Sequence, residues 1–201
     1  MRKGSLGYEI VMTALVLVII AGAAGALLGL VHHFAAVDPE ELLARKASAV
    51  YDGAVVRYPL QEGISQTPDY DKGGVLGVYV PKDDSVKDVY ILRVVGTGAY
   101  KGSLELLVNI TGGKIVKIAK YDANETPGLG SKALEESYFA QYCNVPLTED
   151  FMGFDLVKTT PSAKSEVRAV SGASKSSTAV TNAVNAAVIW YKDMRSKRAT
   201  K

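Results

Sequence analysis

An uncharged run near the N-terminus constrains the fold of this chain more than any other feature. From Ile10 to Val31 the sequence reads IVMTALVLVIIAGAAGALLGLV, without one charged side chain. As a helix, these roughly 22 residues would measure about 33 Å, enough to cross a hydrocarbon core of about 30 Å. A cleaved signal peptide is the alternative, but its apolar region spans only about 7–15 residues. The length therefore favours an uncleaved, single-pass transmembrane helix over residues 10–31.

Basic residues beside this run predict its orientation. Arg2 and Lys3 precede it, and positive charge close to a membrane helix marks the cytoplasmic side. Arg45 and Lys46 lie a little beyond the other end and act against this orientation. We expect residues 1–9 in the cytoplasm and the bulk of the chain outside the inner (cytoplasmic) membrane.

Histidine and cysteine usage excludes most side-chain catalysis in the rest of the chain. The only two histidines, His32 and His33, adjoin the apolar run, and Cys143 is the single cysteine. Without a histidine the remaining domain cannot build a Ser–His–Asp or Cys–His pair, nor a histidine-ligated zinc site. One cysteine excludes an intrachain disulfide, a cysteine-rich metal site and an iron–sulfur cluster. We therefore expect no catalytic residue and no metal site, and the net charge of +2 argues against a nucleic-acid partner.

The residues after the apolar run predict a single α+β domain. Strand patterns cover residues 74–80, 89–95, 103–110, 114–121 and 151–157. Thr111-Gly112-Gly113 joins two of these strands and is typical of a tight hairpin. Asp38 and Pro39 predict the start of a connecting helix that runs to about Val50. We expect residues 32–73 to form this helix and a linker, and residues 74–201 to form a twisted, mainly antiparallel sheet with packed helices.

Two further helices are expected in the C-terminal half. One covers about residues 131–142. The last has the strongest signal, an apolar stripe at helical spacing followed by basic residues; the stripe is Ala179, Val180, Ala183, Val184, Ala187, Val188 and Tyr191.

A serine-rich turn directly before the last helix is the main candidate site. It reads Ser171-Gly172-Ala173-Ser174-Lys175-Ser176-Ser177-Thr178. Small residues allow close approach, a helix N-terminus offers unpaired N–H groups, and Lys175 adds a charge, so phosphate is the natural ligand. A simple helix cap is the alternative from the residues alone. The spacing matches neither a Walker loop nor an S-x-x-K site, and a serine nucleophile would lack a histidine base.

Two motifs in the right order give a specific resemblance. SGASKSS before an Ala/Val-striped helix resembles the flavin-attachment motif of the RnfG/NqrC family, and Glu125-Thr126-Pro127-Gly128-Leu129-Gly130 resembles the family's ETPGLG loop. Gly96-Thr97-Gly98-Ala99-Tyr100-Lys101-Gly102 is similar to its glycine-rich strand start. Together with the membrane anchor, the resemblance covers nearly the whole chain.

The resemblance implies an extracytoplasmic FMN-binding domain. In the family, a separate flavin transferase attaches flavin mononucleotide (FMN) by a phosphoester to the last hydroxyl residue of the motif, which is Ser174 here. The residues implied to surround the phosphate are Ser171, Gly172, Ala173, Lys175, Ser176 and Ser177. The ETPGLG residues implied to approach the flavin are Glu125, Thr126, Pro127, Gly128 and Leu129. The implied function is electron transfer within an Rnf-type membrane complex, an ion-translocating ferredoxin:NAD oxidoreductase.

Two departures from the family pattern keep other functions open. Ser174 stands where the family usually has threonine, and a primary alcohol can form the same phosphoester. Arg168 stands where the family has an acid, three residues before Ser171. Arg168 therefore keeps open a subunit of such a complex without covalent flavin. A stand-alone membrane-anchored flavoprotein is a further alternative.

Overall fold

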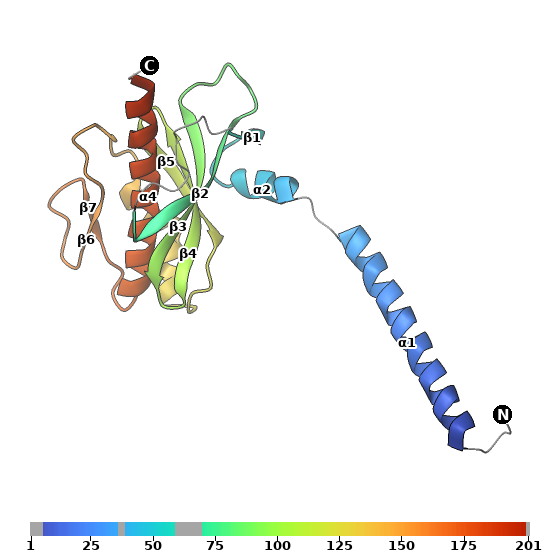
Figure 1. Ribbon diagram of the computed structural model, residues 1–201. Helices are drawn as coiled ribbons and strands as arrows, with labels where there is room; N and C mark the ends of the chain where they lie inside the picture. Colours follow the sequence, from blue (N-terminus) through green and yellow to red (C-terminus); the bar gives the residue numbers. More distant parts are fainter. Residues whose placement is uncertain (1–5, 36–38, 59–69, 200–201) are drawn as a thin grey trace. The chain divides into compact units, whose positions relative to one another are not determined.

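The structure is a computed structural model that describes residues 6–35, 39–58 and 70–199. It divides into two compact units, one up to Leu42 and one from Leu43 onward. Most of the helices and strands of both units are labelled in Figure 1.

The first unit is dominated by helix α1 (Leu6–Ala35). Its stretch Gly7–Phe34 is long and apolar enough to cross a membrane, and none of it is buried. The predicted span of residues 10–31 lies inside this helix, so the predicted helix is confirmed. Helix α2 (Pro39–Ala47) follows, three residues shorter than expected at its C-terminal end. The predicted cap Asp38 lies outside the described residues.

The second unit is built on a five-stranded antiparallel sheet. Its strands lie in the order in which they occur in the chain: β1 (Val55–Arg57), β2 (Gly73–Pro81), β3 (Val89–Ala99), β4 (Gly102–Thr111) and β5 (Lys114–Asp122). Four of the five were predicted, and β1 was not. The β4–β5 hairpin turns at Gly112 and Gly113, with φ of 57° and 73°, so two left-handed residues make the predicted tight turn.

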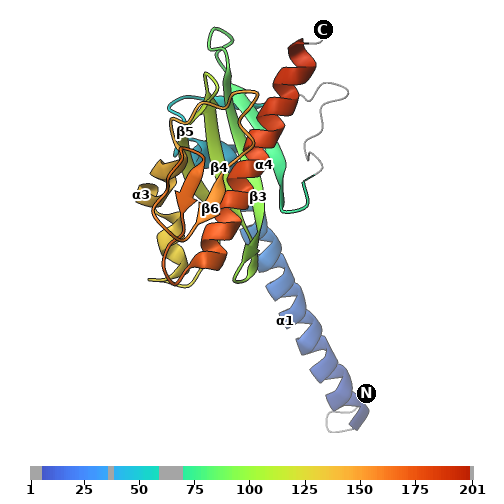
Figure 2. The same cartoon turned by 90° about the vertical axis from the view of Figure 1, so that its left-hand side faces the viewer.

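Helix α4 (Ser174–Ala199) covers one face of this sheet, as both ribbon views show (Figures 1 and 2). All seven residues of the predicted apolar stripe are buried. Gly96 of β3 permits the close approach of the helix. A Cβ atom there would lie 2.5 Å from the backbone nitrogen of Ala183 and 2.9 Å from its Cβ. Any larger residue would push helix and strand apart.

The opposite face of the sheet is covered by the end of α2 and the residues after it. Ala47 and Val50 form an apolar cluster there with Val89, Ile91 and Leu107. Asn109, buried on β4, donates from its side-chain amide to the Val50 carbonyl at 2.8 Å. This bond ties the turn after α2 to β4.

The segment between β5 and α4 differs most from prediction. The single helix predicted over residues 131–142 is wrong: the chain forms η1 (Gly130–Leu134), α3 (Glu136–Phe139) and η2 (Ala140–Tyr142). Glu135 is extended, with φ −83° and ψ 149°. Its carbonyl accepts the N–H groups of Tyr138 and Phe139, so a new helical turn starts at this residue.

The strand predicted over residues 151–157 is shorter in the structure. Only β6 (Asp155–Val157) is a strand, and it pairs in parallel with β7 (Glu166–Arg168). Phe154 is held instead by Asn185 of α4, whose side chain accepts its N–H at 2.7 Å and donates to its carbonyl at 2.9 Å. Both backbone groups of Phe154 are therefore taken up by a side chain and cannot join a strand ladder.

Candidate functional site

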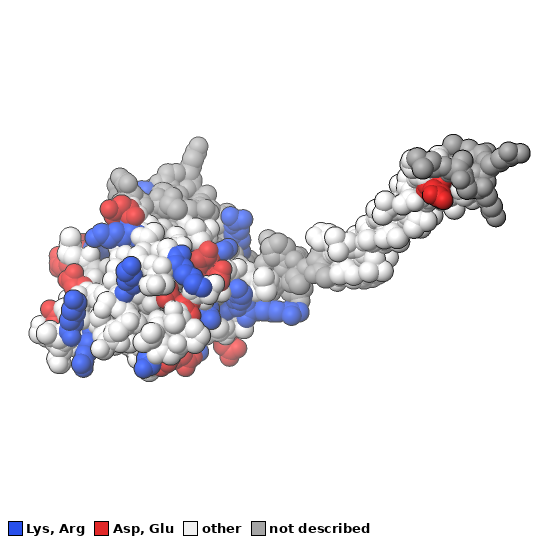
Figure 3. Space-filling model, turned by 90° about the horizontal axis from the view of Figure 1, so that it is seen from below, with Lys and Arg blue, Asp and Glu red and all other residues white. Residues whose placement is uncertain are grey.

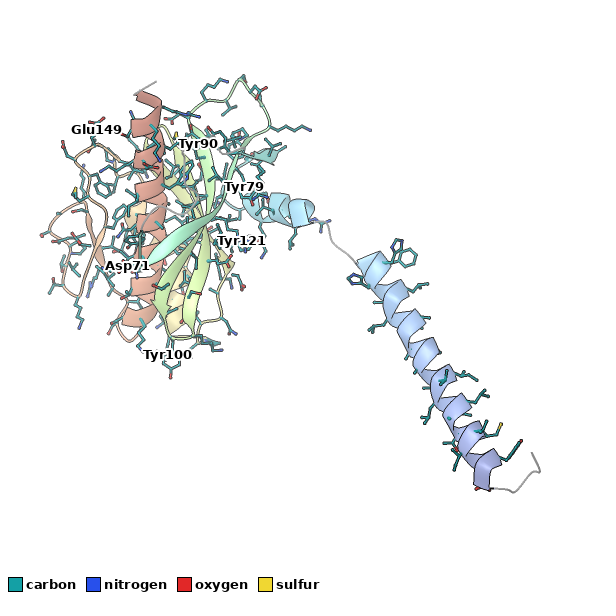
Figure 4. The ribbon with its side chains drawn as sticks, viewed as in Figure 1. Asp71, Tyr79, Tyr90, Tyr100, Tyr121 and Glu149 are labelled. Atoms are coloured by element: carbon teal, nitrogen blue, oxygen red, sulfur yellow. The ribbon has the colours of Figure 1, made fainter. Side chains whose placement is uncertain are left out.

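The loop after β5, the turn between β3 and β4, and the first turn of α4 line an open pocket of about 540 Å³. Figure 4 shows Tyr100 at the end of the domain where these segments meet. The lining residues are Tyr100, Glu125, Thr126, Leu129, Gly130, Gly172, Ala173, Ser174, Lys175 and Ser176. The two motif segments, about 50 residues apart in the sequence, thus share one cavity.

The first turn of α4 presents unpaired donors to this pocket. Gly172 has φ 79°, and the chain turns there into the helix. The Ala173 carbonyl accepts the N–H of Ser177 at 2.9 Å, so Ala173 occupies the cap position and Ser174 the first helical position. Within the described residues, no carbonyl or side chain accepts the backbone N–H groups of Ser174, Lys175 or Ser176. Three free donors at a helix N-terminus favour an anion.

Ser174 and Ser176 line the same pocket but differ in exposure and in hydrogen bonding. Ser174 is exposed, whereas Ser176 is only 3% exposed. The Ser176 hydroxyl donates to Glu125 Oε2 at 2.7 Å. Ser176 is therefore already bonded across the pocket, to the segment that follows β5.

Ser177 does not reach the pocket. It is fully buried, and its Oγ accepts the N–H of Val170 at 3.0 Å. Burial raises the pKa of the Tyr138 phenol beneath it, and hydrogen bonds with Ser177 and Tyr142 partly offset this rise. The Tyr142 hydroxyl in turn lies 2.8 Å from that of Thr181. Ser177 thus anchors the motif loop to the core, which differs from the phosphate contact that the resemblance implied.

The loop after β5 contributes both polar and apolar groups. Gly128 has φ 75°, and its N–H donates to the Ser131 hydroxyl at 2.9 Å. Pro127 and Gly128 form this turn without lining the pocket, while Leu129 lines it and is 52% exposed. Ser171 likewise lies outside the lining.

Two lining residues, Tyr100 and Gly130, were not among the expected site residues. Tyr100 follows β3 and is 71% exposed, and Lys175 Nζ lies 5.6 Å from its ring centroid. Tyr100 belongs to the glycine-rich segment 96–102, which the sequence singled out as a strand start, so that segment carried the signal.

The charges around the pocket are mixed. Lys175 and the helix N-terminus are positive, and Glu125 is the one acid among the described residues that line the pocket. Seen from the end of the domain at which Tyr100 lies, lysine, arginine and acidic side chains alternate over the surface (Figure 3). The attraction for an anion is therefore local to the first turn of α4. The pocket can hold a phosphate at that turn and a flat apolar group beside Leu129 and Tyr100.

Arg168 lies away from this cavity. It is the last residue of β7 and is exposed, and its backbone N–H donates to Gln141 Oε1 at 3.0 Å. Its side chain is not part of the lining. Within the described residues, no group of three or more histidine, cysteine or acidic side chains could hold a metal ion.

Comparison with protein families gives one matching domain. Residues 99–189 match the FMN-binding domain. This range begins just before Tyr100 and ends within α4, so it contains the whole pocket lining.

Two curated bacterial proteins are similar in sequence. The first is the G subunit of the Na(+)-translocating ferredoxin:NAD(+) oxidoreductase complex of Acetobacterium woodii, 31% identical over 122 residues, or 60% of this chain and 57% of that protein. The second is the G subunit of the proton-translocating ferredoxin:NAD(+) oxidoreductase complex of Clostridium ljungdahlii, 36% identical over 90 residues, or 44% of this chain and 46% of that protein. The chain thus spans about half the length of these relatives.

A solved structure has the same fold. The crystal structure of Shewanella oneidensis NqrC aligns with a TM-score of 0.50 and 19% identity, over 70% of this chain and 71% of that chain. At this identity the likeness concerns the fold alone.

Proposed function

We propose that this chain, which belongs to the RnfG/NqrC family, is the FMN-carrying electron-transfer subunit of an Rnf-type ferredoxin:NAD oxidoreductase complex. Its partners are then the other membrane subunits of that complex. Helix α1 anchors it in the cytoplasmic membrane, with the domain on the extracytoplasmic side. The curated relatives, both named as the G subunits of such complexes, support this assignment.

The observation that carries the proposal is the shared pocket of the two motif segments. Its first-turn N–H groups and Lys175 suit a phosphate, and Leu129 and Tyr100 suit the flavin ring. When bound, FMN supplies the electron-transfer chemistry, and the protein supplies position and electrostatics. No side chain is required as acid or base, in keeping with a domain sequence that has no histidine.

Ser174 is the proposed acceptor of a covalent phosphoester. Among the described motif serines it is the exposed one that lines the pocket, whereas Ser176 is bonded to Glu125 and Ser177 is buried. A separate flavin transferase would move the FMN part of FAD onto Ser174. The bond from Ser174 Oγ to phosphorus forms as the phosphoanhydride bond breaks, AMP leaves with the electron pair, and the serine proton passes to a base of the transferase or to water.

Arg168 favours a second candidate function, a structural subunit without covalent flavin. It stands where the resemblance implies an acid, and it lies outside the pocket lining. If the acid guides the transferase, its absence would prevent attachment while leaving the pocket intact.

Flavin fluorescence in a denaturing gel tests the proposal. The full chain is expressed with a flavin transferase as wild type, as Ser174→Ala and as Ser103→Ala, the last being a control for an exposed serine outside both the motif and the pocket lining. We expect a fluorescent band for wild type and Ser103→Ala and a dark band for Ser174→Ala. A dark wild-type band would support the structural subunit instead. Copurification of other membrane subunits then distinguishes a complex from a stand-alone flavoprotein.

A further inference from the structure

Glu125 occupies an unusual place for an acid. It lines a pocket whose other features favour an anion, and it is half-buried there. Within the described residues no lysine or arginine forms an ion pair with it. Its described partner is the Ser176 hydroxyl at 2.7 Å. A carboxylate at this position would repel a phosphate bound at the first turn of α4, and no described cation pairs with the carboxylate to offset that repulsion. The bond to Ser176 is therefore the interaction that favours Glu125 at this position.

Gly130 packs against the Glu125–Ser176 pair. A Cβ atom at Gly130 would contact the Glu125 carboxylate and lie 2.7 Å from Ser176 Oγ. The loop therefore folds back on its own first residue and encloses the hydrogen bond. Glu125, Gly130 and Ser176 form one tight contact, which fixes the loop after β5 against the first turn of α4.

We propose that Glu125 is a positioning residue that selects the flavin acceptor. Its bond to Ser176 fixes the first turn of α4 and engages the other serine hydroxyl among the described lining residues, leaving the Ser174 hydroxyl free. This inference rests on the proposed function, because it concerns which hydroxyl receives the flavin phosphate. Without Glu125, Ser176 becomes a second acceptor in the same pocket.

Mapping of the flavin adduct tests the selection. The full chain is coexpressed with a flavin transferase, and tryptic peptides are analysed by mass spectrometry. Wild type and Glu125→Gln should carry FMN on Ser174 alone, since the amide oxygen still accepts the Ser176 proton. In Glu125→Ala we expect at least roughly a tenth of the adduct on Ser176. The double variant Glu125→Ala, Ser176→Ala should return to Ser174 alone. If Glu125→Ala still carries FMN on Ser174 alone, Glu125 does not select the acceptor and the inference is overturned.

A double-mutant cycle on thermal unfolding tests the positioning without flavin. Tm is followed in detergent by the fluorescence of Trp190, the single tryptophan, which is fully buried. We expect Glu125→Ala and Ser176→Ala each to lower Tm by about 3–6 °C, and the double variant to lower it by no more than the larger single change. Glu149→Ala, which removes an exposed carboxylate elsewhere, is the control. Additive changes overturn the positioning.

The two measurements separate the inference from the proposed function. If wild type carries no covalent flavin, the proposed attachment and the selection fail together. The double-mutant cycle is measured on protein without flavin. It therefore tests whether Glu125 positions Ser176 whether or not the wild-type protein is modified.

Discussion

Replacing Gly96 by alanine should loosen the contact between α4 and the sheet. The new Cβ would lie 2.5 Å from the Ala183 nitrogen and 2.9 Å from the Ala183 Cβ, and it would also contact the Ala179 carbonyl. Ordinary carbon contacts are about 3.5–4.0 Å, so helix and strand must separate by about an ångström. Two of the three obstacles are backbone atoms, which have no alternative rotamer.

The expected cost follows from these contacts. Overpacking of a core costs about 1–3 kcal/mol, and the rigid backbone obstacles place Gly96→Ala at the upper end of that range. The lower entropy of the unfolded chain offsets about 0.4–1 kcal/mol, which leaves about 2–2.6 kcal/mol. For a unit of this size, each kcal/mol lowers Tm by about 2–4 °C. We therefore expect a decrease of about 4–10 °C, measured in detergent by the fluorescence of Trp190.

Gly102→Ala is the matched control, because it adds the same methyl group to the next strand. No atom lies within 4 Å of a Cβ at Gly102, although its φ of 104° adds strain. Left-handed strain costs about 1–2 kcal/mol, a smaller loss than that expected at Gly96. If Gly96→Ala melts no lower than Gly102→Ala, steric conflict with α4 is not what requires glycine at position 96.

Two further predictions concern pH and redox potential. Burial raises the pKa of the Tyr142 phenol well above its ordinary value of 10.0. The unfolded chain therefore loses this proton first, and stability should fall as pH rises past about 10. Tm of Tyr142→Phe should fall less steeply between pH 9 and 11, and equal slopes would contradict this. Lys175→Gln should lower the midpoint potential of bound flavin by roughly 10–20 mV, because an exposed cation contributes about 0.5–1 kcal/mol to a two-electron couple. Redox titration against Lys101→Gln checks it, and an unchanged potential would mean that Lys175 does not act on the flavin.

Elements with strong local signals were predictable from the sequence. The β4–β5 hairpin follows from Gly112 and Gly113, which adopt left-handed conformations at no steric cost. The buried face of α4 follows from its apolar spacing, and every residue of that stripe is buried. In both cases the information lies within a few residues of the element itself.

Elements that depend on distant partners were missed. The residues around Phe154 have the sequence pattern of a strand, but the Asn185 side chain of α4 forms hydrogen bonds with the N–H and the carbonyl of Phe154. Val55–Arg57 is a strand only because β2 pairs with it. The site shows the same limit: from sequence, Ser176 and Ser177 are equivalent motif serines. The fold bonds one to Glu125 and the other to Val170.

The N-terminal half of α4 is held from three directions, and none of these contacts uses the Ser174 hydroxyl. Gly96 lets α4 pack closely against β3. The Ser177 hydroxyl accepts the Val170 N–H of the preceding loop, and the Ser176 hydroxyl donates to Glu125 of the loop after β5. Loss of flavin in a variant of any of these residues therefore reports the position of the acceptor, whereas loss in Ser174→Ala reports the bond itself. Because Ser174 is exposed, its replacement should leave Tm unchanged. A variant that loses flavin without a change in Tm has therefore lost the acceptor hydroxyl itself. A variant that loses flavin and also melts at a lower temperature has lost a contact that positions the acceptor.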